Sequence, residues 1–374
     1  MLKTTFIGLD VHAKTVTAAA LNADTGEIDQ ATMPADNPTV ISWIKAHGDD
    51  TAVTYEAGPT GYGLARDLTD QGITCTVAAP SKLLRAPGDR VKTDQRDALG
   101  LARMLSLGEI TAVRVPPIGQ EGLRDVSRAR QRAVLDLTHA RQRINAMILR
   151  HGLRYPKDTK WTQVHHDWLA RQRLEPAASQ QALSAELETE TLLMAHVRRL
   201  DATIADLVAE AEETPIIDAL MCFRGISITT GFGLAVEIGD WTRFTGATIG
   251  SYLGLTPSEH SSGQSRSQGA ITKAGNTYAR KLLIEAAWSH ARPYSRPGAR
   301  LLRQFDKVDA ATRVRAIEGN QRLHRVWANF DARKKRRVKA NTAVARELAG
   351  WCWSVAAPLQ MNVTGPEGQE AQMG

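Results

Sequence analysis

The sequence predicts an α/β N-terminal domain, a central long-helix segment and a mainly α C-terminal domain. Short apolar runs alternate with helix-like runs over roughly the first 110 residues. From residue 121 to residue 213 the composition changes to Arg, Gln, Glu, Ala and Leu, with no strand pattern. The chain has 374 residues, and single cores usually stop growing at about 250 to 300 residues. We therefore expect more than one domain.

We expect four consecutive segments. Residues 1–115 form the α/β domain, residues 116–214 a helical coiled-coil linker, and residues 215–358 the C-terminal domain. Residues 359–374 are rich in Gly, Pro, Gln and Glu, a composition that favours a disordered tail.

The first domain is expected to hold a mixed sheet with helices packed on its faces. Its second strand is followed by NADTG at residues 22–26, a turn sequence that can close a hairpin. The expected strands are residues 5–10, 16–21, 28–33, 52–56 and 74–79, and the expected helices are residues 38–47, 62–71 and 94–107.

The central segment contains a heptad seam. Apolar residues step by alternating intervals of four and three, as in helices that pair along one stripe. The seam consists of Leu193, Val197, Leu200, Ile204, Leu207 and Ala211. Residues 120–150 are a second long helical candidate, so the seam can serve an antiparallel pair within the chain or an intermolecular coiled coil.

The C-terminal part combines helices with a serine-rich stretch. Residues 222–241 indicate a turn followed by a helix, and their start resembles one half of a helix-hairpin-helix, whose turn can direct N–H groups at a phosphate. Residues 277–290 form another expected helix, with Asn276 as its N-cap. Between them, HSSGQSRSQGAITKAGN at residues 260–276 has the composition of a surface loop.

Charge is distributed unevenly along the chain. Residues 260–346 hold 20 Lys and Arg against 5 Asp and Glu, whereas the whole chain carries a formal +7. A basic C-terminal half joined to a more acidic front favours nucleic acid as the partner. An anionic membrane surface is the weaker alternative, because no strongly amphipathic anchor accompanies the charge.

Cysteine usage and hydropathy restrict the class of protein further. Cys75, Cys222 and Cys352 are far apart and lack metal-ligand spacing, which argues against a zinc site and structural disulfides. The sequence contains no apolar run long enough to span a membrane and no signal-peptide pattern at its start. We expect a soluble, cytoplasmic protein.

Four carboxylates stand where a metal site can form. Asp10 and Glu56 end two expected strands, and Asp94 and Asp97 share one face of a helix's first turn. Hard divalent ions take oxygen ligands, and paired ions stabilise both oxygens exchanged at a phosphodiester. Singly, Asp10 has an alternative explanation as a turn residue and Asp97 as a helix-dipole residue.

Five ordered motifs carry a family resemblance. They are GLDVH (residues 8–12), YEAGPTG (55–61), KTDQRDA (92–98), GLTPSEHSSG (254–263) and ITKAGN (271–276). Together they resemble the DEDD transposases of the insertion sequence 110 family over roughly residues 6–288. Related site-specific DNA invertases share the same two-part plan. The first motif also opens actin-like sugar kinases and ATPases, but the Gly-rich phosphate loops typical of those proteins are absent from the sequence.

The resemblance implies a catalytic domain of RuvC-like, ribonuclease-H-type fold that binds Mg²⁺ (or Mn²⁺) through Asp10, Glu56, Asp94 and Asp97. It also implies a C-terminal transposase domain whose nucleophilic serine, directly before the Gly of its loop, is Ser262. Family members recombine donor and target DNA under direction of a structured guide RNA. A homo-oligomer, a dimer or tetramer, is expected because strand exchange needs more than one active site.

Basic residues near the serine stretch are candidate phosphate contacts, with a solvated helix face as the alternative. His12 and Lys14 can also reach a phosphate near Asp10, although a single histidine of this kind is more often structural. The nucleic-acid-binding candidates are Arg266, Lys273, Arg280, Lys281, Arg333, Lys334, Lys335, Arg336 and Arg337.

Two rival functions remain open. The first is a RuvC-like nuclease that hydrolyses DNA with the acids and water. The second is a nucleic-acid-binding protein whose acids are catalytically inactive.

Overall fold

A computed structural model of the chain describes residues 3–83, 93–262 and 265–363. The side chains of residues 81, 260–262, 265–268 and 362–363 lie outside this description. The chain forms two compact units, Met1–Pro117 and Ile118–Gly374.

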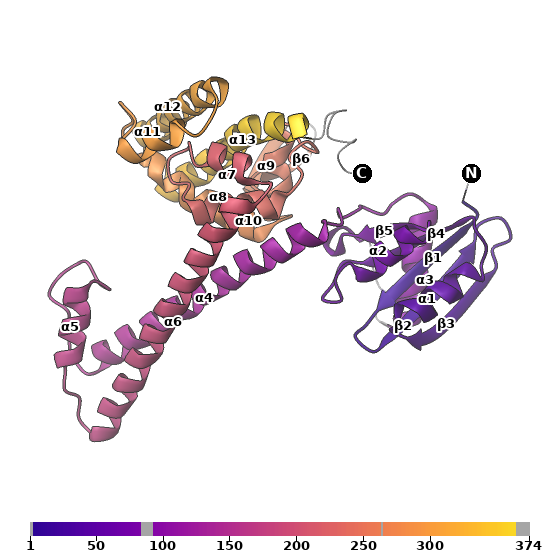
Figure 1. Ribbon diagram of the computed structural model, residues 1–374, viewed down its shortest axis with the longest axis horizontal. Helices are drawn as coiled ribbons and strands as arrows, with labels where there is room; N and C mark the ends of the chain where they lie inside the picture. Colours follow the sequence, from indigo (N-terminus) through magenta and orange to yellow (C-terminus); the bar gives the residue numbers. More distant parts are fainter. Residues whose placement is uncertain (1–2, 84–92, 263–264, 364–374) are drawn as a thin grey trace. The chain divides into compact units, whose positions relative to one another are not determined.

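The N-terminal unit is built on a five-stranded mixed sheet of order β3-β2-β1-β4-β5 (Figure 1). β1, β2 and β3 are antiparallel neighbours, and β4 and β5 run parallel to β1. The strands are β1 (Thr5–Val11), β2 (Thr15–Asn22), β3 (Ile28–Pro34), β4 (Thr51–Glu56) and β5 (Thr74–Ala78). All five expected strands are confirmed, and the architecture is consistent with a RuvC-like α/β domain.

Helices cover both faces of this sheet. The face that carries Ile7 and Leu9 packs against α1 (Asn37–Lys45) and α2 (Gly63–Asp70) in one buried core. The opposite face of β1, which carries Gly8, packs against α3 (Asp94–Ser106). A short 3₁₀ helix, η1 (Pro80–Lys82), follows β5. The three expected α-helices of this unit are thereby confirmed.

Gly8 determines how closely α3 approaches β1. A Cβ at this position would lie 2.0 Å from the carbonyl oxygen of Ala98 and 2.6 Å from the backbone nitrogen of Ala102. Ala98 and Ala102 are themselves fully buried, so small residues line both sides of the contact. The helix backbone therefore rests directly on the strand that carries Asp10.

The C-terminal unit begins with a pair of long helices. α4 (Ile118–Arg150) and α6 (Ala177–Glu210) run side by side, and the shorter α5 (Gln163–Arg171) lies near the end of the pair (Figure 1). The heptad seam faces α4: Val197 packs with Ala133 and Leu137. Of the two arrangements left open by the sequence, the structure has the antiparallel pair within the chain.

The rest of this unit is a mainly helical body with a large apolar core. The expected cap of α10 is confirmed, because the Asn276 side chain accepts a hydrogen bond from the Ala279 N–H. The elements are α7 (Thr214–Leu220), α8 (Ile228–Ile238), α9 (Thr248–Tyr252), β6 (Pro257–Ser262), β7 (Ser265–Ile271), α10 (Thr277–Ala287), η2 (Trp288–Ala291), α11 (Ala299–Phe305), α12 (Ala310–Ala332) and α13 (Arg337–Val363).

Two sequence predictions are wrong in this unit. The serine-rich stretch is not simply a surface loop, since β6 and β7 pair there as an antiparallel hairpin. The expected tail does not begin at residue 359, because α13 continues through Pro358 to Val363. Gln360 explains the continuation: its side chain accepts from the Trp241 N–H at 2.7 Å and donates to the Gly239 carbonyl at 3.0 Å. Residues 364–374 lie outside the described part.

Among the residues that the structure describes, no helix is both long and apolar enough to cross a membrane.

Candidate functional site

The carboxyl edge of the sheet carries the first two acids. β1 and β4 are parallel neighbours with Leu9 opposite Tyr55, so Asp10 and Glu56 occupy the next position on each strand. Leu9 and Tyr55 are buried in the core shared with α1 and α2. Because successive side chains on a strand point to opposite faces, Asp10 and Glu56 belong to the face that α3 covers.

The N-terminus of α3 supplies the other two acids. The Thr93 side chain caps the helix by accepting a hydrogen bond from the Arg96 N–H. Asp94 and Asp97 lie in the first turn, where negative charge interacts favourably with the helix dipole. The buried contact of α3 with β1 orients this turn toward the end of the strand that carries Asp10.

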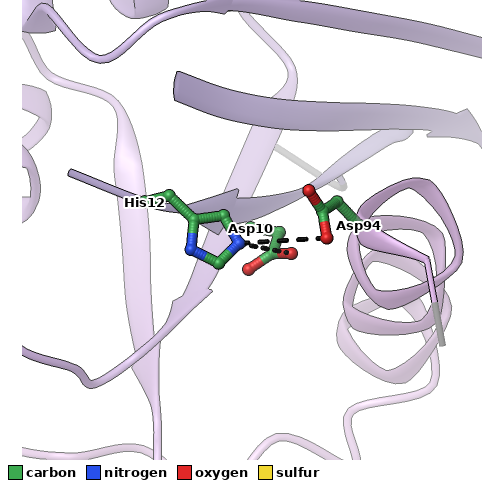
Figure 2. A group of neighbouring side chains, drawn as sticks. All are labelled: Asp10, His12 and Asp94. Carbon is green, nitrogen blue, oxygen red and sulfur yellow. Dashed lines mark ion pairs between the residues drawn. The ribbon is translucent and has the colours of Figure 1, made fainter. Parts of the chain in front are cut away.

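Three side chains converge at this point: Asp10, His12 and Asp94 (Figure 2). The His12 Nε2 atom lies 3.3 Å from the Asp10 Oδ2 atom and 3.9 Å from the Asp94 Oδ1 atom. One ligand atom from each of the three residues lies within 4.8 Å of the other two. Figure 2 shows Asp10 on β1, His12 directly after the end of that strand, and Asp94 in the first turn of α3.

The electrostatics of Asp10 reflect this crowding. Partial burial raises the pKa of the Asp10 carboxyl above its ordinary value, and the charges of Asp94 and Asp97 raise it further. The neighbouring His12 opposes these effects and lowers the pKa. A cation held among these groups would offset the repulsion between the carboxylates.

Not all four predicted acids belong to the tight group. Asp97 is close enough for its charge to act on Asp10, yet it is not among the three residues whose ligand atoms converge. Glu56 is exposed at the end of β4 and is also outside that group. The structure therefore brings two of the four acids together and leaves the other two on the same side of the sheet.

His12 was not included in the predicted ligand set. A signal for it exists in the strand pattern, because residues two apart on a strand share a face. Asp10 and His12 have this spacing in β1, which extends to Val11, and His12 follows it directly. A histidine judged by itself gives no such information, whereas a histidine placed in register with a candidate ligand does.

The donor set is compatible with a divalent cation. The two carboxylates supply the oxygen ligands that suit Mg²⁺ and Mn²⁺, and the imidazole adds a nitrogen ligand of the kind that transition metals bind. Asp10 is partly buried, while His12 and Asp94 are exposed, so the group is accessible to a substrate phosphate. A hard divalent ion thus fits the residues present.

Ser262 lies on a separate feature, which we call the serine hairpin and define as β6, β7 and the residues between them. Ser262 is the last residue of β6 and is paired in register with Ser265, the first residue of β7. The side chains of Ser262 and Arg266 lie outside the described part of the structure. The backbone places Ser262 at the end of β6, opposite Ser265.

Close backbone contacts hold together the two segments that lead into β6 and out of β7. We call these segments, residues 252–256 and 272–275, the foot of the serine hairpin. Gly254 has φ +63°, and a Cβ there would lie 2.3 Å from the Ala274 carbonyl oxygen. Gly275 has φ +66°, and a Cβ there would lie 1.8 Å from the Tyr252 carbonyl oxygen. Both positions thus require glycine, for the left-handed backbone as well as for space. The segments that lead into β6 and out of β7 are thereby fixed against each other.

Arg280, which the sequence predicted to contact a phosphate, is buried in the structure. Its side chain is only 7% exposed. The guanidinium Nη1 donates to the carbonyl oxygens of Leu253 at 3.0 Å and Ala274 at 2.8 Å, and Nη2 donates to the Thr277 hydroxyl at 3.2 Å. Arg280 therefore stabilises the foot of the serine hairpin from inside, and burial lowers its pKa. Helical spacing alone did not distinguish this buried position from an exposed one.

The other predicted cations differ in their surroundings. Lys273 is exposed at the foot of the serine hairpin, with φ +56°. Lys281 lies on α10, 3.6 Å from the Glu285 carboxylate. The run of Arg333, Lys334, Lys335, Arg336 and Arg337 is exposed where α12 ends and α13 begins.

Comparisons with known proteins agree across most of the chain. The transposase family IS116/IS110/IS902 matches residues 217–301, and a transposase family of the DEDD, IS110 type matches residues 7–152. A putative transposase y4qE of Sinorhizobium fredii is 39% identical over 357 residues, which cover 94% of this chain and 88% of the relative.

A second relative is similar over the whole of its own length. The transposase for insertion sequence element IS1533 of Leptospira borgpetersenii is 27% identical over 348 residues, 91% of this chain and 100% of that protein. A probable family 20 transposase of Pseudomonas aeruginosa is 28% identical over 240 residues, 63% of this chain and 70% of that protein. The two family matches fall on the segment with the clustered acids and on the segment with the serine hairpin.

Proposed function

Because this chain belongs to the IS116/IS110/IS902 family of insertion-sequence transposases, we propose that it cuts and rejoins DNA through a phosphoserine intermediate on Ser262. The acids at the edge of the RuvC-like N-terminal unit, Asp10, Glu56, Asp94 and Asp97, assist with a bound Mg²⁺ or Mn²⁺. The convergence of Asp10, His12 and Asp94 is the observation that supports the metal-binding part of this proposal, and the assignment of Ser262 rests on the family resemblance.

The N-terminal residues hold and orient the scissile phosphate in this mechanism. Asp10 and Asp94 would ligate the cation, His12 would complete its coordination or contact the phosphate, and Glu56 and Asp97 would contribute from the same edge. When bound, the cation supplies charge stabilisation for the oxygens exchanged at phosphorus. The raised pKa of Asp10 is consistent with such a site, since the carboxylates repel one another without a counter-charge.

Ser262 performs the covalent step. A bond forms between its Oγ atom and the scissile phosphorus while the bond from phosphorus to one DNA oxygen breaks. In net balance, the serine proton appears on the released DNA hydroxyl. A hydroxyl of another strand reverses the step, restores Ser262 and joins the new ends, so no external energy source is needed. Serine is a weak nucleophile unless its proton is removed or its target is polarised, which is why both units are required.

The proposal also includes nucleic-acid partners and further copies of this chain. The excess of cations in residues 260–346 supports a nucleic-acid surface that includes Lys273, Lys281 and the run from Arg333 to Arg337. A structured guide RNA that pairs with donor and target DNA is part of the proposal through the family resemblance, as is a homo-oligomer that acts in the bacterial cytosol. The exposed state of the residue 333–337 run supports its access to a polyanion.

Hydrolysis by the N-terminal unit is the second candidate function. The three converging side chains lie on one unit and contain the ligands that a metal-assisted attack by water needs. In that case Ser262 would have no covalent role.

A covalent-adduct assay distinguishes the two functions. The protein is incubated with Mg²⁺, its cognate RNA and end-labelled DNA, and the quenched reaction is separated on a denaturing gel. We expect a protein–DNA adduct that disappears in Ser262→Ala and persists in Ser261→Ala. Cleavage without an adduct, unchanged in Ser262→Ala, would establish hydrolysis instead, and binding without strand breakage would indicate an inactive binding protein.

A further inference from the structure

A cavity of about 760 Å³ in the C-terminal unit has a lining that the proposed reaction does not use. It lies among the turn before α8, η2 and the segment that leads into α11. Its described lining contains no Asp or Glu. The lining residues that matter here are Arg224, Trp288, Arg292, Tyr294, Arg296 and Arg300, and we call this the arginine–tryptophan pocket.

Arg224 fixes one wall of the pocket. Its guanidinium donates to the carbonyl oxygens of Ser289 at 2.5 Å and Arg292 at 3.0 Å. The same group lies 5.4 Å from the centre of the Tyr294 ring. These contacts connect the segment after η2 to the turn before α8. The backbone that leads to Arg296 and Arg300 is therefore anchored at Arg292. The pocket is therefore organised by its own hydrogen bonds.

Among the described residues, no acid forms an ion pair with the remaining arginines of the pocket. Arg292, Arg296 and Arg300 recur every fourth residue, and all three are exposed. Burial lowers the pKa of Arg224, and the nearby charge of Arg292 lowers it further. Neighbouring cations repel one another, and an anion bound between them relieves this repulsion. A guanidinium can bind two phosphate oxygens at once.

Trp288 adds an aromatic surface to the same cavity. It is 41% exposed, and its ring lies 5.4 Å from that of the buried Trp327, which supports it from behind. The two rings are tilted by 56°, and the contact leaves part of the aromatic face of Trp288 exposed to solvent. Bases stack on such faces in single-stranded nucleic acids, while bases in a duplex are already stacked on each other.

We infer that the arginine–tryptophan pocket binds an unpaired nucleotide of a single-stranded nucleic-acid segment, with the base on Trp288 and the flanking phosphates at Arg292, Arg296 and Arg300. An aromatic face alone would suit many apolar ligands, and the arginines alone would suit any polyanion. An aromatic ring and several arginines line the same cavity, and its described lining has no acids. This lining favours a ligand that has both a planar ring and negative charge. The inference does not depend on the phosphoserine step, because binding needs neither the metal nor Ser262.

Binding by the full-length protein in EDTA tests this inference. The probes are fluorescent 12-mers of deoxythymidine, the same length of uridine, and a 12-base-pair DNA duplex. We expect Trp288→Leu to weaken binding of the single strands about 5- to 150-fold, the range for losing one stacked base, and to leave duplex binding unchanged. Trp288→Phe keeps an aromatic face and should stay within about 3-fold of the wild type.

The arginines are tested through the salt dependence of binding. Arg296→Gln should lower the slope of log affinity against log salt by about 0.7, the value for one phosphate contact on a single strand. Arg150→Gln on α4 removes the same charge from an exposed position far along the chain and should leave the slope for single strands unchanged.

Several outcomes would decide the matter. Equal losses for single strands and duplex in Trp288→Leu, or no loss at all, would overturn the inference. Thermal unfolding of the variants shows whether a loss reflects unfolding, and Trp288→Phe remains decisive if Trp288→Leu is unstable, since it should lose the nucleotide-dependent fluorescence quenching of Trp288 and keep affinity. A preference for the uridine or the deoxythymidine probe identifies the source as RNA or DNA. Ser262→Ala should bind normally, so failure of the phosphoserine proposal is distinguishable.

Discussion

The acids of the N-terminal unit and the serine hairpin of the C-terminal unit are positioned by different means. Asp10 lies one residue before the end of β1, a central strand that is paired on both sides, and α3 rests directly on that strand at Gly8. Ser262 ends a strand that has only β7 as its partner in a two-stranded sheet. The acids thus take their geometry from a sheet core, whereas the serine hairpin takes its geometry from the backbone contacts at its foot.

The difference indicates where substitutions should act. Asp94 and His12 are exposed, so removing their functional groups should affect chemistry without unfolding the domain. Gly8 and Arg280 are enclosed by neighbouring atoms and support the two sites from behind. Substitutions at those two positions should couple stability to activity.

The largest effect is expected for Asp94→Asn. The change removes a charged ligand while keeping the size of the side chain, and a cation contributes several kcal/mol of transition-state stabilisation, equivalent to about 10³-fold in rate. We expect adduct formation to fall by at least that factor, with thermal unfolding unchanged, in the covalent-adduct assay. The raised pKa of Asp10 should also fall toward its ordinary value, because the charge of Asp94 contributes to raising it.

Asp24→Asn is the matched control for this change. Asp24 is an exposed acid in the turn between β2 and β3, where asparagine is equally acceptable. It should retain full activity. If Asp94→Asn did so as well, the metal role of the converging side chains would be refuted.

Gly8→Ala should have the next largest effect. The new methyl group would lie 2.0 Å from the Ala98 carbonyl oxygen, so α3 must move away from β1. We expect a loss of about 3 kcal/mol in unfolding free energy, at the upper end for overpacking. A displacement of about 1 Å in a catalytic group can cost about 100-fold in rate. Chemical denaturation and the adduct assay measure the two effects.

Gly100→Ala on the same helix sharpens this result. A Cβ at Gly100 would meet nothing within 4 Å. Replacing a glycine inside a helix by alanine should stabilise the unit by about 0.5 to 1 kcal/mol, with no loss of activity. If both variants behaved alike, the direct contact at Gly8 would not be what positions Asp94.

Arg280→Gln tests how the serine hairpin is held. Removing the guanidinium leaves the carbonyl oxygens of Leu253 and Ala274 without this donor, which costs about 2 kcal/mol in unfolding free energy. Adduct formation should fall as the foot of the serine hairpin loosens. The salt dependence of DNA binding should not change, because Arg280 is buried. If the slope of log affinity against log salt fell by the amount expected for one phosphate contact, Arg280 would contact a DNA phosphate after all.

The order of strands and helices in the N-terminal unit could be predicted because it depends on local patterns. Alternation in residues 5–10 and the turn at residues 22–26 are visible in the sequence. The packing of α3 directly on β1 could not be predicted from the sequence. It depends on a contact between Gly8 and Ala98, two residues that are far apart in the chain. His12 was missed for the same reason, as its significance comes from its register with Asp10.

In the C-terminal unit the failures have a common physical cause. The composition of residues 260–276 favours turns, yet backbone pairing between β6 and β7 overrides that preference. Pro358 is usually a helix breaker, but the bonds from Gln360 to Trp241 and Gly239 hold the helix beyond it. Arg280 has the sequence context of a surface cation and is buried by Leu253 and Ala274. Long-range contacts decided each case.

The smallest effect is expected for Lys273→Asn. Lys273 is exposed at φ +56°, and asparagine tolerates this left-handed backbone, so stability should stay within about 0.5 kcal/mol. Loss of one phosphate contact on duplex DNA should lower the salt slope by about 0.9 and weaken binding only a few-fold. Lys157→Asn, at an exposed position near α5, should do neither. If the salt dependence of DNA binding were unchanged in Lys273→Asn, Lys273 would not contact a DNA phosphate. Lys273 and Arg280 would then differ in burial but not in DNA contact.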